Sequence, residues 1–182
     1  PKDLEKIEAL LADEKCVAVG EIGLDYHWMS STKEKQRAFF EAQLELANRL
    51  GLPVIVHDRE AHGDTLEILK KYRPKGVLHA FSGSREMAKE ILDIGMYLGF
   101  GGVLTFKNAR KATEVLQEIP KERILFETDC PYMSPEPFRG RRNDSAKIAF
   151  VAQKAAALLG CTAQEIIDVT AKNAKRLFWS GE

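Results

Sequence analysis

The chain has 182 residues, 45% hydrophobic and 30% charged, which excludes a disordered or low-complexity protein and allows one globular domain with a sizeable core. Lys plus Arg and Asp plus Glu each total 27, so no overall positive charge attracts nucleic acid, and any anion site must be local. Three isolated cysteines and the lack of a leader or a long apolar run favour a soluble, cytoplasmic protein that does not enter membranes.

Short apolar runs alternate with amphipathic helices five times along the chain, after a first helix expected at residues 4–11. This alternation predicts an α/β fold with a parallel sheet and no domain break. The expected strands are residues 16–22, 53–57, 76–81, 97–102 and 123–129. The expected helix starts are a capping box of Ser31 with Glu34, Asp64, Ser84, Asn108, and a capping box of Thr162 with Glu165.

Polar residues stand where four of these strands are expected to end, namely Glu21, His57, His79 and Asp129. Parallel α/β folds bind ligands at the carboxyl ends of their strands, because the loops there present functional groups over a rigid core. Two imidazoles and two carboxylates together suit zinc, manganese or iron in a hydrolytic site. The pattern therefore predicts a divalent-metal hydrolase.

Each of these residues also has an ordinary structural explanation. A single histidine at a strand end is more often a hydrogen-bonded structural residue than a ligand, and a carboxylate there can cap a turn. Two carboxylates that end apolar runs favour function, because burying them is costly unless they are paired or bind metal. His27 is expected to pack against its aromatic neighbours, and His62 to be solvated or to cap a helix.

Six segments resemble the TatD family of metal-dependent deoxyribonucleases in order and approximate spacing. They are "GEIGLDYHW", "PVIVHDREAHGDTLEIL", "GVLHAFSGS", "GGVLTFKNA", "ETDCPYMSPEPFRGRRN" and "NAKRLF". The resemblance runs from about Cys16 to Phe178, which is nearly the whole chain.

The resemblance implies a TIM-barrel hydrolase of the amidohydrolase type with one or two divalent ions, such as zinc, magnesium or manganese. It implies that Glu21 bridges the two ions and that His57 and His79 bind one of them. It also implies that Asp129 binds the other ion and orients or deprotonates the attacking water. These four residues coincide with the ones that the strand ends indicate.

The amino-terminal part of the chain departs from the family pattern. A full barrel has eight strands, and family members open with a His-x-His strand that completes the second metal position. This chain has five strand-helix units and no His-x-His. We therefore expect residues 1–182 to form one partial barrel domain without its N-terminal part, with one firm metal and one weak or absent metal. The exposed barrel edges should favour self-association.

The expected reaction is cleavage of phosphodiester bonds in DNA by metal-activated water, in which Asp129 accepts the proton. Glu127 is expected either to orient a ligand or to form a salt link inside the barrel, with no preference between the two. Two alternatives remain: an ester hydrolase that acts on misacylated tRNA, and a non-catalytic truncated remnant.

Contacts with the phosphates of a substrate require local donors. The loop that carries Arg139, Arg141 and Arg142 offers guanidinium groups, which can bind phosphate with two hydrogen bonds. Arg59 and Ser82 are expected to lie over the strand ends as well. A cluster of arginines in a loop is often only solvated, and the sequence does not decide between the two explanations.

Overall fold

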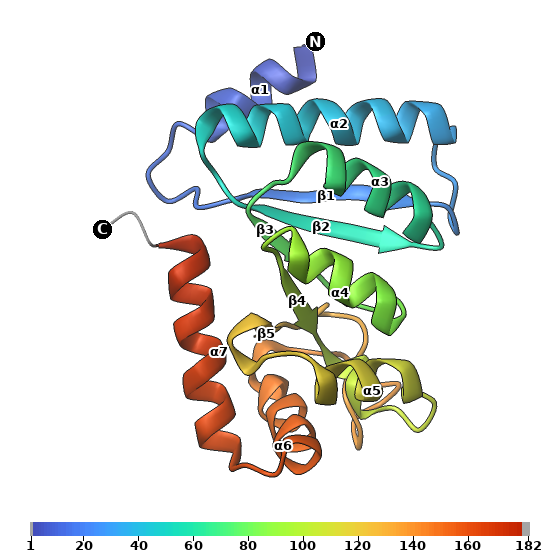
Figure 1. Ribbon diagram of the computed structural model, residues 1–182, viewed down its shortest axis with the longest axis vertical. Helices are drawn as coiled ribbons and strands as arrows, with labels where there is room; N and C mark the ends of the chain where they lie inside the picture. The colour runs from blue at the N-terminus through green and yellow to red at the C-terminus, as the bar shows by residue number, and fades with distance from the viewer. Residues whose placement is uncertain (1, 180–182) are drawn as a thin grey trace.

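The strands of this protein form one parallel sheet in which each strand pairs with the next one in the chain (Figure 1). The computed structural model describes residues 2–179. The strands are β1 (Val19–Asp25), β2 (Val54–Arg59), β3 (Gly76–Leu78), β4 (Tyr97–Phe100) and β5 (Ile124–Phe126). Within the described residues, β1 and β5 each pair on one side only, so the sheet is open at both edges.

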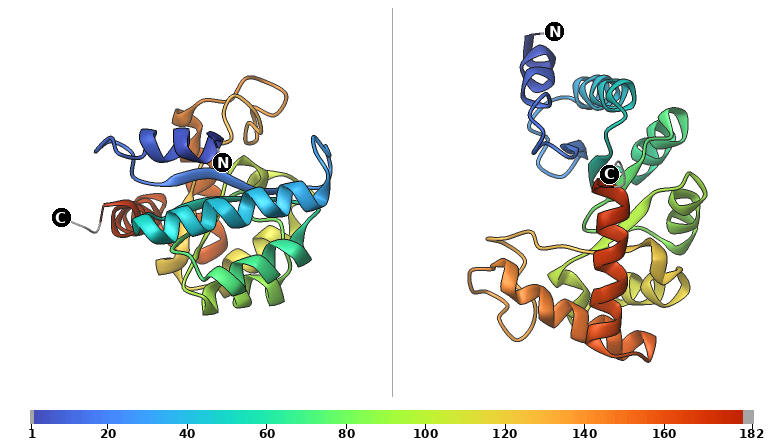
Figure 2. Two further views of the ribbon diagram at one scale, coloured as in Figure 1. Left: turned by 90° about the horizontal axis from the view of Figure 1, so that it is seen from above. Right: turned by 90° about the vertical axis from the view of Figure 1, so that its left-hand side faces the viewer.

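Helices connect the strands, because parallel neighbours need a crossover connection. The helices are α1 (Lys2–Leu10), α2 (Lys33–Leu50), α3 (His62–Tyr72), α4 (Arg85–Asp93), α5 (Arg110–Glu118), α6 (Ile148–Leu159) and α7 (Ala163–Phe178). Three short 3-10 turns lie at Gly102–Thr105, Lys121–Arg123 and Ser145–Lys147. Figures 1 and 2 show α2 to α5 following one another around the outside of the curved sheet.

The outer face of the sheet carries the main core. Side chains such as Val54, Leu78 and Leu98 are almost completely buried there, against apolar residues of α2 to α6. Their neighbours in the sequence point to the opposite, inner face, because side chains alternate along a strand. The outer face therefore forms the core, and the inner face is available for other side chains.

The inner face is divided between an apolar half and a polar half. Towards the amino ends of the strands, Val77 and Leu125 pack with Leu177 of α7. Two residues further along the same strands come His79 and Glu127, at the carboxyl ends. The helix α7 therefore covers the apolar half, and the polar half remains beside a pocket of about 390 Å³.

The strand limits differ from those expected from the sequence. The first strand is Val19–Asp25 and not residues 16–22, so Glu21 lies in its interior and not near its end. The last residue pair between β1 and β2 is Asp25 with Arg59. Gly23 permits this continuation, because a Cβ at its φ of 143° would clash with the carbonyl of His57. The third and fifth strands are shorter than expected, so His79 follows β3 directly and Asp129 lies three residues after the end of β5.

Three expected helix starts are wrong and two are confirmed. The cap of α2 is Thr32, which accepts from the backbone N–H of Lys35, and not Ser31. The helix α3 begins at His62 and not at Asp64, and α5 begins at Arg110 without a side-chain cap from Asn108. Ser84 caps α4, and Thr162 forms the capping box of α7 with Glu165.

No single helix within residues 2–179 is both long and apolar enough to cross a membrane. Only the bent pair of Ser145–Leu159 and Ala163–Phe178 reaches the required length and composition together.

Candidate metal centre

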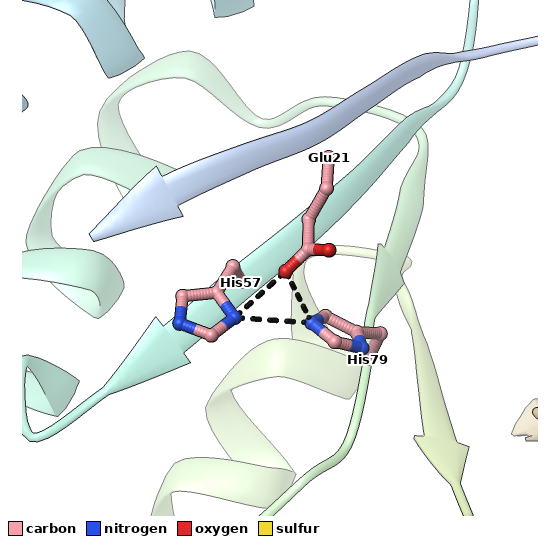
Figure 3. Close-up of side chains that lie close together, drawn as sticks. All are labelled: Glu21, His57 and His79. Carbon is pink, nitrogen blue, oxygen red and sulfur yellow. Dashed lines mark hydrogen bonds and ion pairs between the residues drawn. The ribbon is translucent and has the colours of Figure 1, made fainter. Parts of the chain in front are cut away.

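Glu21, His57 and His79 come from three neighbouring strands and meet on the inner face (Figure 3). Oε1 of Glu21 lies 2.7 Å from Nδ1 of His57 and 2.8 Å from Nε2 of His79. The two nitrogens lie 3.2 Å apart. The structure therefore directs one oxygen and two nitrogens to a common point.

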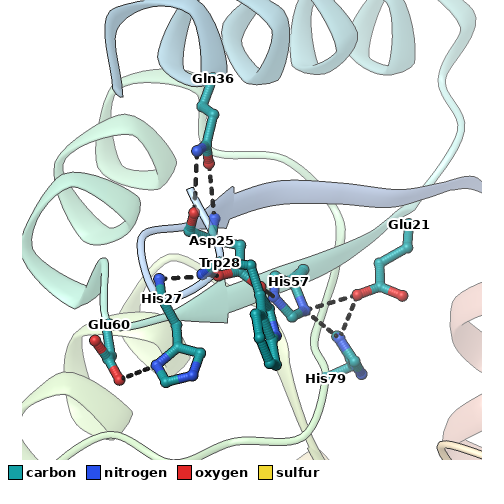
Figure 4. A network of polar contacts seen from close by, with 8 residues as sticks. All are labelled: Glu21, Asp25, His27, Trp28, Gln36, His57, Glu60 and His79. Carbon is teal, nitrogen blue, oxygen red and sulfur yellow. Dashed lines mark hydrogen bonds and ion pairs between the residues drawn. The ribbon is translucent and has the colours of Figure 1, made fainter. Parts of the chain in front are cut away.

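A carboxylate lies behind each imidazole of this triad. Nε2 of His57 is 3.2 Å from Oδ2 of Asp25 (Figure 4), and Nδ1 of His79 is 3.2 Å from Oε2 of Glu127. Such a carboxylate holds a proton on the outer ring nitrogen and leaves the lone pair of the inner nitrogen for a ligand. The contact of Glu127 with His79 is compatible with both roles expected from the sequence, orientation of a ligand and a salt link.

Asp25 is a further candidate site residue, which the sequence did not indicate. Its Oδ1 accepts the backbone N–H groups of His27 and Trp28, both at 2.9 Å, while its Oδ2 faces His57. The side chain of Gln36 bonds to both the backbone N–H and the carbonyl of Asp25 (Figure 4). A strand that continues past Ile22 would have revealed it, because alternation puts residues 21, 23 and 25 on one face.

Electrostatics at the triad favour positive charge between its members. Hydrogen bonds from His57 and His79 hold the pKa of the Glu21 carboxyl far below its usual range. Burial of His79 lowers its pKa, but Glu127 and Glu21 outweigh this effect and raise the pKa to about 10. The bond to Glu21 likewise raises the pKa of His57. Protons on the imidazoles and a divalent cation would therefore compete for the same place.

The donor set of the triad fits a divalent ion. Ligands of tetrahedral zinc lie about 2.0–2.1 Å from the ion and hence about 3.3 Å apart. The three donor atoms here are separated by 2.7, 2.8 and 3.2 Å. Small movements of these side chains would therefore bring the three atoms to the separations that zinc requires. Three protein ligands with one open position are typical of catalytic zinc sites.

A second group of ligand atoms shares His79 with the first. His79, Glu127 and Asp129 each offer an atom within 4.8 Å of the others. The carboxylate of Glu127 occupies space that only a glycine leaves open, because a Cβ at Gly101 would clash with its Oε1. Asp129 therefore lies close to His79, one member of the triad.

The two other histidines stand apart from the triad. His27 contacts Trp28 edge to face with ring centroids 4.8 Å apart, and its Nδ1 lies 2.7 Å from Oε1 of Glu60. His62 lies in the first turn of α3, where its Nδ1 is 2.6 Å from Oδ2 of Asp58. His27 therefore packs against an aromatic neighbour, and His62 bonds to a carboxylate at the start of a helix.

The expected phosphate-binding residues lie in the loops around the strand ends. Arg59 ends β2 with its guanidinium 5.5 Å from the ring centre of Trp28, and Ser82 is exposed in the loop after β3. The guanidinium of Arg139 lies 4.3 Å from the ring centre of Phe106, and Arg141 is exposed. Within residues 2–179, Arg59, Arg139 and Arg141 form no ion pair with a carboxylate.

A parallel α/β sheet with a His and Glu cluster at its carboxyl end defines the class of metal-dependent hydrolases with barrel-type folds. The family model described as TatD related DNase matches residues 1–179. The chain therefore belongs to the TatD family.

Relatives in several bacteria support this assignment. The chain is 48% identical over 180 residues to the metal-dependent hydrolase YabD of Bacillus subtilis, covering 97% of this chain and 71% of YabD. It is 41% identical to the metal-dependent hydrolase YcfH of Escherichia coli, covering 98% and 68%. The 3'-5' ssDNA/RNA exonuclease TatD of Klebsiella pneumoniae is 38% identical, with 98% and 71% covered.

Solved structures show the same fold. The TatD homologue YJJV of E. coli superposes with a TM-score of 0.87 at 35% identity, covering 96% of this chain and 69% of that one. A TatD family hydrolase of Entamoeba histolytica gives a TM-score of 0.85 at 26% identity, covering 97% and 68%. The fold is thus the TIM-barrel-like fold of this family, of which the chain spans about two thirds.

Proposed function

We propose that this chain hydrolyses phosphodiester bonds of single-stranded DNA with a divalent ion held by Glu21, His57 and His79. The observation that carries the proposal is the convergence of these three donor atoms, with a carboxylate behind each imidazole. The exonuclease of K. pneumoniae named above supports the choice of substrate, because its name specifies ssDNA and RNA.

The residues of the chain divide the chemistry among them. A divalent ion, when bound, supplies the Lewis acid that polarises a phosphoryl oxygen and makes water more acidic. His57 and His79 bind through the inner nitrogens while Asp25 and Glu127 hold the outer ones in position. Asp129, next to His79, accepts the proton of the attacking water.

Binding of the phosphates falls to the arginines in the surrounding loops. Arg59, Arg139 and Arg141 offer guanidinium groups that can each bind a phosphate with two hydrogen bonds. Ser82 adds a hydroxyl in the loop after β3, three residues after His79. This arrangement supplies local positive charge to a chain whose overall charge is balanced.

Hydrolysis of an end-labelled single-stranded oligodeoxynucleotide, with zinc, magnesium or manganese supplied separately, tests the proposal. We expect cleavage with at least one ion. Replacing Asp129 by Asn should lower the rate about 100-fold or more, the usual scale for loss of a general base. Replacing His79 by Ala should also lower the rate, because it removes a ligand of the ion.

His62→Ala is the matched control, because it removes an imidazole that bonds to Asp58 and not to the triad. It should retain most of the activity. A wild-type chain that binds the ion but cleaves no phosphodiester with any of the three would contradict the proposed function and favour a non-catalytic role.

A further inference from the structure

A tryptophan is displayed on the protein surface beside the metal centre. Trp28 lies three residues after the end of β1, and 70% of its surface is exposed. Its backbone N–H is held at 2.9 Å by Oδ1 of Asp25, whose other oxygen faces His57 (Figure 4). One carboxylate thus fixes both the loop that carries the indole and a member of the triad.

One cation lies beside this indole, and two more lie near its neighbours. Arg59 lies 5.5 Å from its ring centre, and Lys33 lies 4.4 Å from the ring centre of the neighbouring Tyr26. Lys35 lines a pocket of about 570 Å³ together with His57 and Asp25. Two carboxylates also lie nearby: Asp25, which accepts the backbone N–H of Trp28, and Glu60, which bonds to His27.

A second aromatic residue occupies an equivalent place at the other edge of the sheet. Tyr132 follows β5 and is 74% exposed. Its backbone N–H donates to the carbonyl of Asp129 at 2.8 Å, and its carbonyl accepts from the amide of the buried Asn143 at 2.7 Å. Both edge strands therefore lead from a carboxylate of the site to an exposed aromatic ring on an anchored loop.

These two aromatic residues share a further feature of the backbone. Trp28 is followed by Met29 with a φ of 45°, and Tyr132 is followed by Met133 with a φ of 54°. Left-handed conformations are uncommon for residues other than glycine, and they cluster at ligand-binding sites. Because both rings are exposed, a ligand at the strand ends can reach them.

We propose that Trp28 and Tyr132 are stacking platforms for unpaired bases on either side of the metal centre. A single strand would place one base on each ring, while Arg59 contacts the phosphate near Trp28. Stacking on an aromatic side chain accepts any base, because every base has a π face. This inference rests on the proposed function and adds to it that the substrate is recognised through unpaired bases as well as phosphates.

Tryptophan fluorescence tests the proposal, since Trp28 and Trp179 are the two tryptophans of the chain. Trp179→Phe isolates the signal of Trp28, and Asp129→Asn in the same chain prevents turnover. A ten-nucleotide oligothymidylate should quench this signal. An abasic strand of equal length and a duplex of the same sequence should quench it much less.

Affinity measurements by fluorescence anisotropy provide the second readout. Trp28→Leu and Tyr132→Leu should each weaken binding of the labelled oligothymidylate about 5-fold to 100-fold, the range for loss of one stacked base. Trp28→Phe keeps a π face and should restore most of the affinity. The affinity of either leucine variant for the abasic strand should change far less.

Failure of the stacking proposal and failure of the proposed function give different results. Wild-type hydrolysis of the oligothymidylate, together with unchanged affinity in a leucine variant, overturns the stacking role of that residue alone. Base-dependent quenching without hydrolysis by the wild-type chain supports stacking and counts against the proposed function. Equal quenching by the duplex overturns recognition of unpaired bases.

Discussion

Asp25 connects three parts of the site with one side chain. It holds the outer nitrogen of His57, the loop of His27 and Trp28, and through its backbone the helix residue Gln36. A carboxylate in this position fixes both the ring orientation and the tautomer of the ligand histidine. The geometry of the centre therefore depends on a residue that would not itself bind the ion.

Asp25→Asn should weaken binding of a divalent ion about 10-fold to 100-fold, the usual effect of losing such a partner. An amide that donates to Nε2 of His57 forces the proton onto Nδ1, the atom that faces Glu21. Competition with a chelating dye, using zinc and manganese, measures the affinity. Glu60→Gln removes a carboxylate that bonds to His27 and not to the triad, so it should bind the ion normally. Equal affinities in the two variants would exclude this role of Asp25.

The residues of the site were predictable in part from their places in the sequence. Glu21, His57, His79 and Asp129 stand in or directly after apolar runs, and the structure brings all four to one region of the inner face. Asp25 was not predicted, because the first strand was expected to end at Ile22. What the sequence lacked was the pairing with β2, which extends β1 as far as Asp25.

At the scale of the elements, the N-cap of α2 differs between the sequence, which indicates Ser31, and the structure, which shows Thr32. Thr32→Ala should lower the free energy of unfolding by about 1 kcal/mol, because the Thr32 side chain satisfies the N–H of Lys35. Ser31→Ala, at the cap position that the sequence indicates, should change it by less than about 0.5 kcal/mol. Urea unfolding of the two variants at pH 7 decides between the caps. A larger effect of Ser31→Ala would show that the cap is Ser31.

A bond between Tyr26 and Asp64 joins the loop after β1 to α3. The hydroxyl of Tyr26 donates to Oδ2 of Asp64 at 2.6 Å, and this bond, together with Arg37, lowers the pKa of Asp64. Burial and Asp64 raise the pKa of Tyr26 to about 12. The bond therefore stabilises the fold above the unfolded pKa of Asp64, near 3.9, and up to the unfolded pKa of Tyr26, near 10.

Tyr26→Phe should lower the free energy of unfolding by about 1 kcal/mol at pH 7. This figure is at the low end for a bond to a charged group, because 37% of the Asp64 side chain is exposed. As the pH falls through the folded pKa of Asp64, the difference from the wild type should shrink. Urea unfolding of both chains between pH 3 and pH 9 measures it. A difference that stays constant down to pH 3 would show that the bond does not depend on the Asp64 carboxylate.

The periodicity of the sequence predicted the order and type of the helices and strands, but it did not predict the residues at which they begin and end. Five apolar runs gave the five strands in the correct order, since helical and strand periods are well separated. Caps at Ser84 and Thr162 were visible because the whole pattern of the first turn is local. The start of α3 at His62 could not be predicted, because its N-cap residue Ala61 forms no side-chain cap bond and so leaves no local pattern.

At the scale of the whole molecule, the sheet is a curved segment with two open edges. The sequence of this chain matches the relatives YabD and YcfH over 71% and 68% of their own lengths. Closed barrels have no free strand edges, and an open edge with apolar neighbours favours association. In this chain the edge strand β1 lies next to Phe39 of α2, which is 44% exposed and lines the same pocket as Glu21 and Ile22.

Self-association of the chain is therefore expected to involve the β1 edge and to be sensitive to Phe39. Sedimentation velocity over a 100-fold range of concentration should show a dimer that dissociates on dilution. Phe39→Glu should raise the dissociation constant at least about 10-fold, because it places a charge against apolar surface that the partner would cover. Gln153→Glu adds the same charge to the exposed side of α6, away from β1, and should leave the dimer unchanged. A chain that stays monomeric at the highest concentration, or a dimer equally weakened by both variants, would show that the β1 edge does not mediate association.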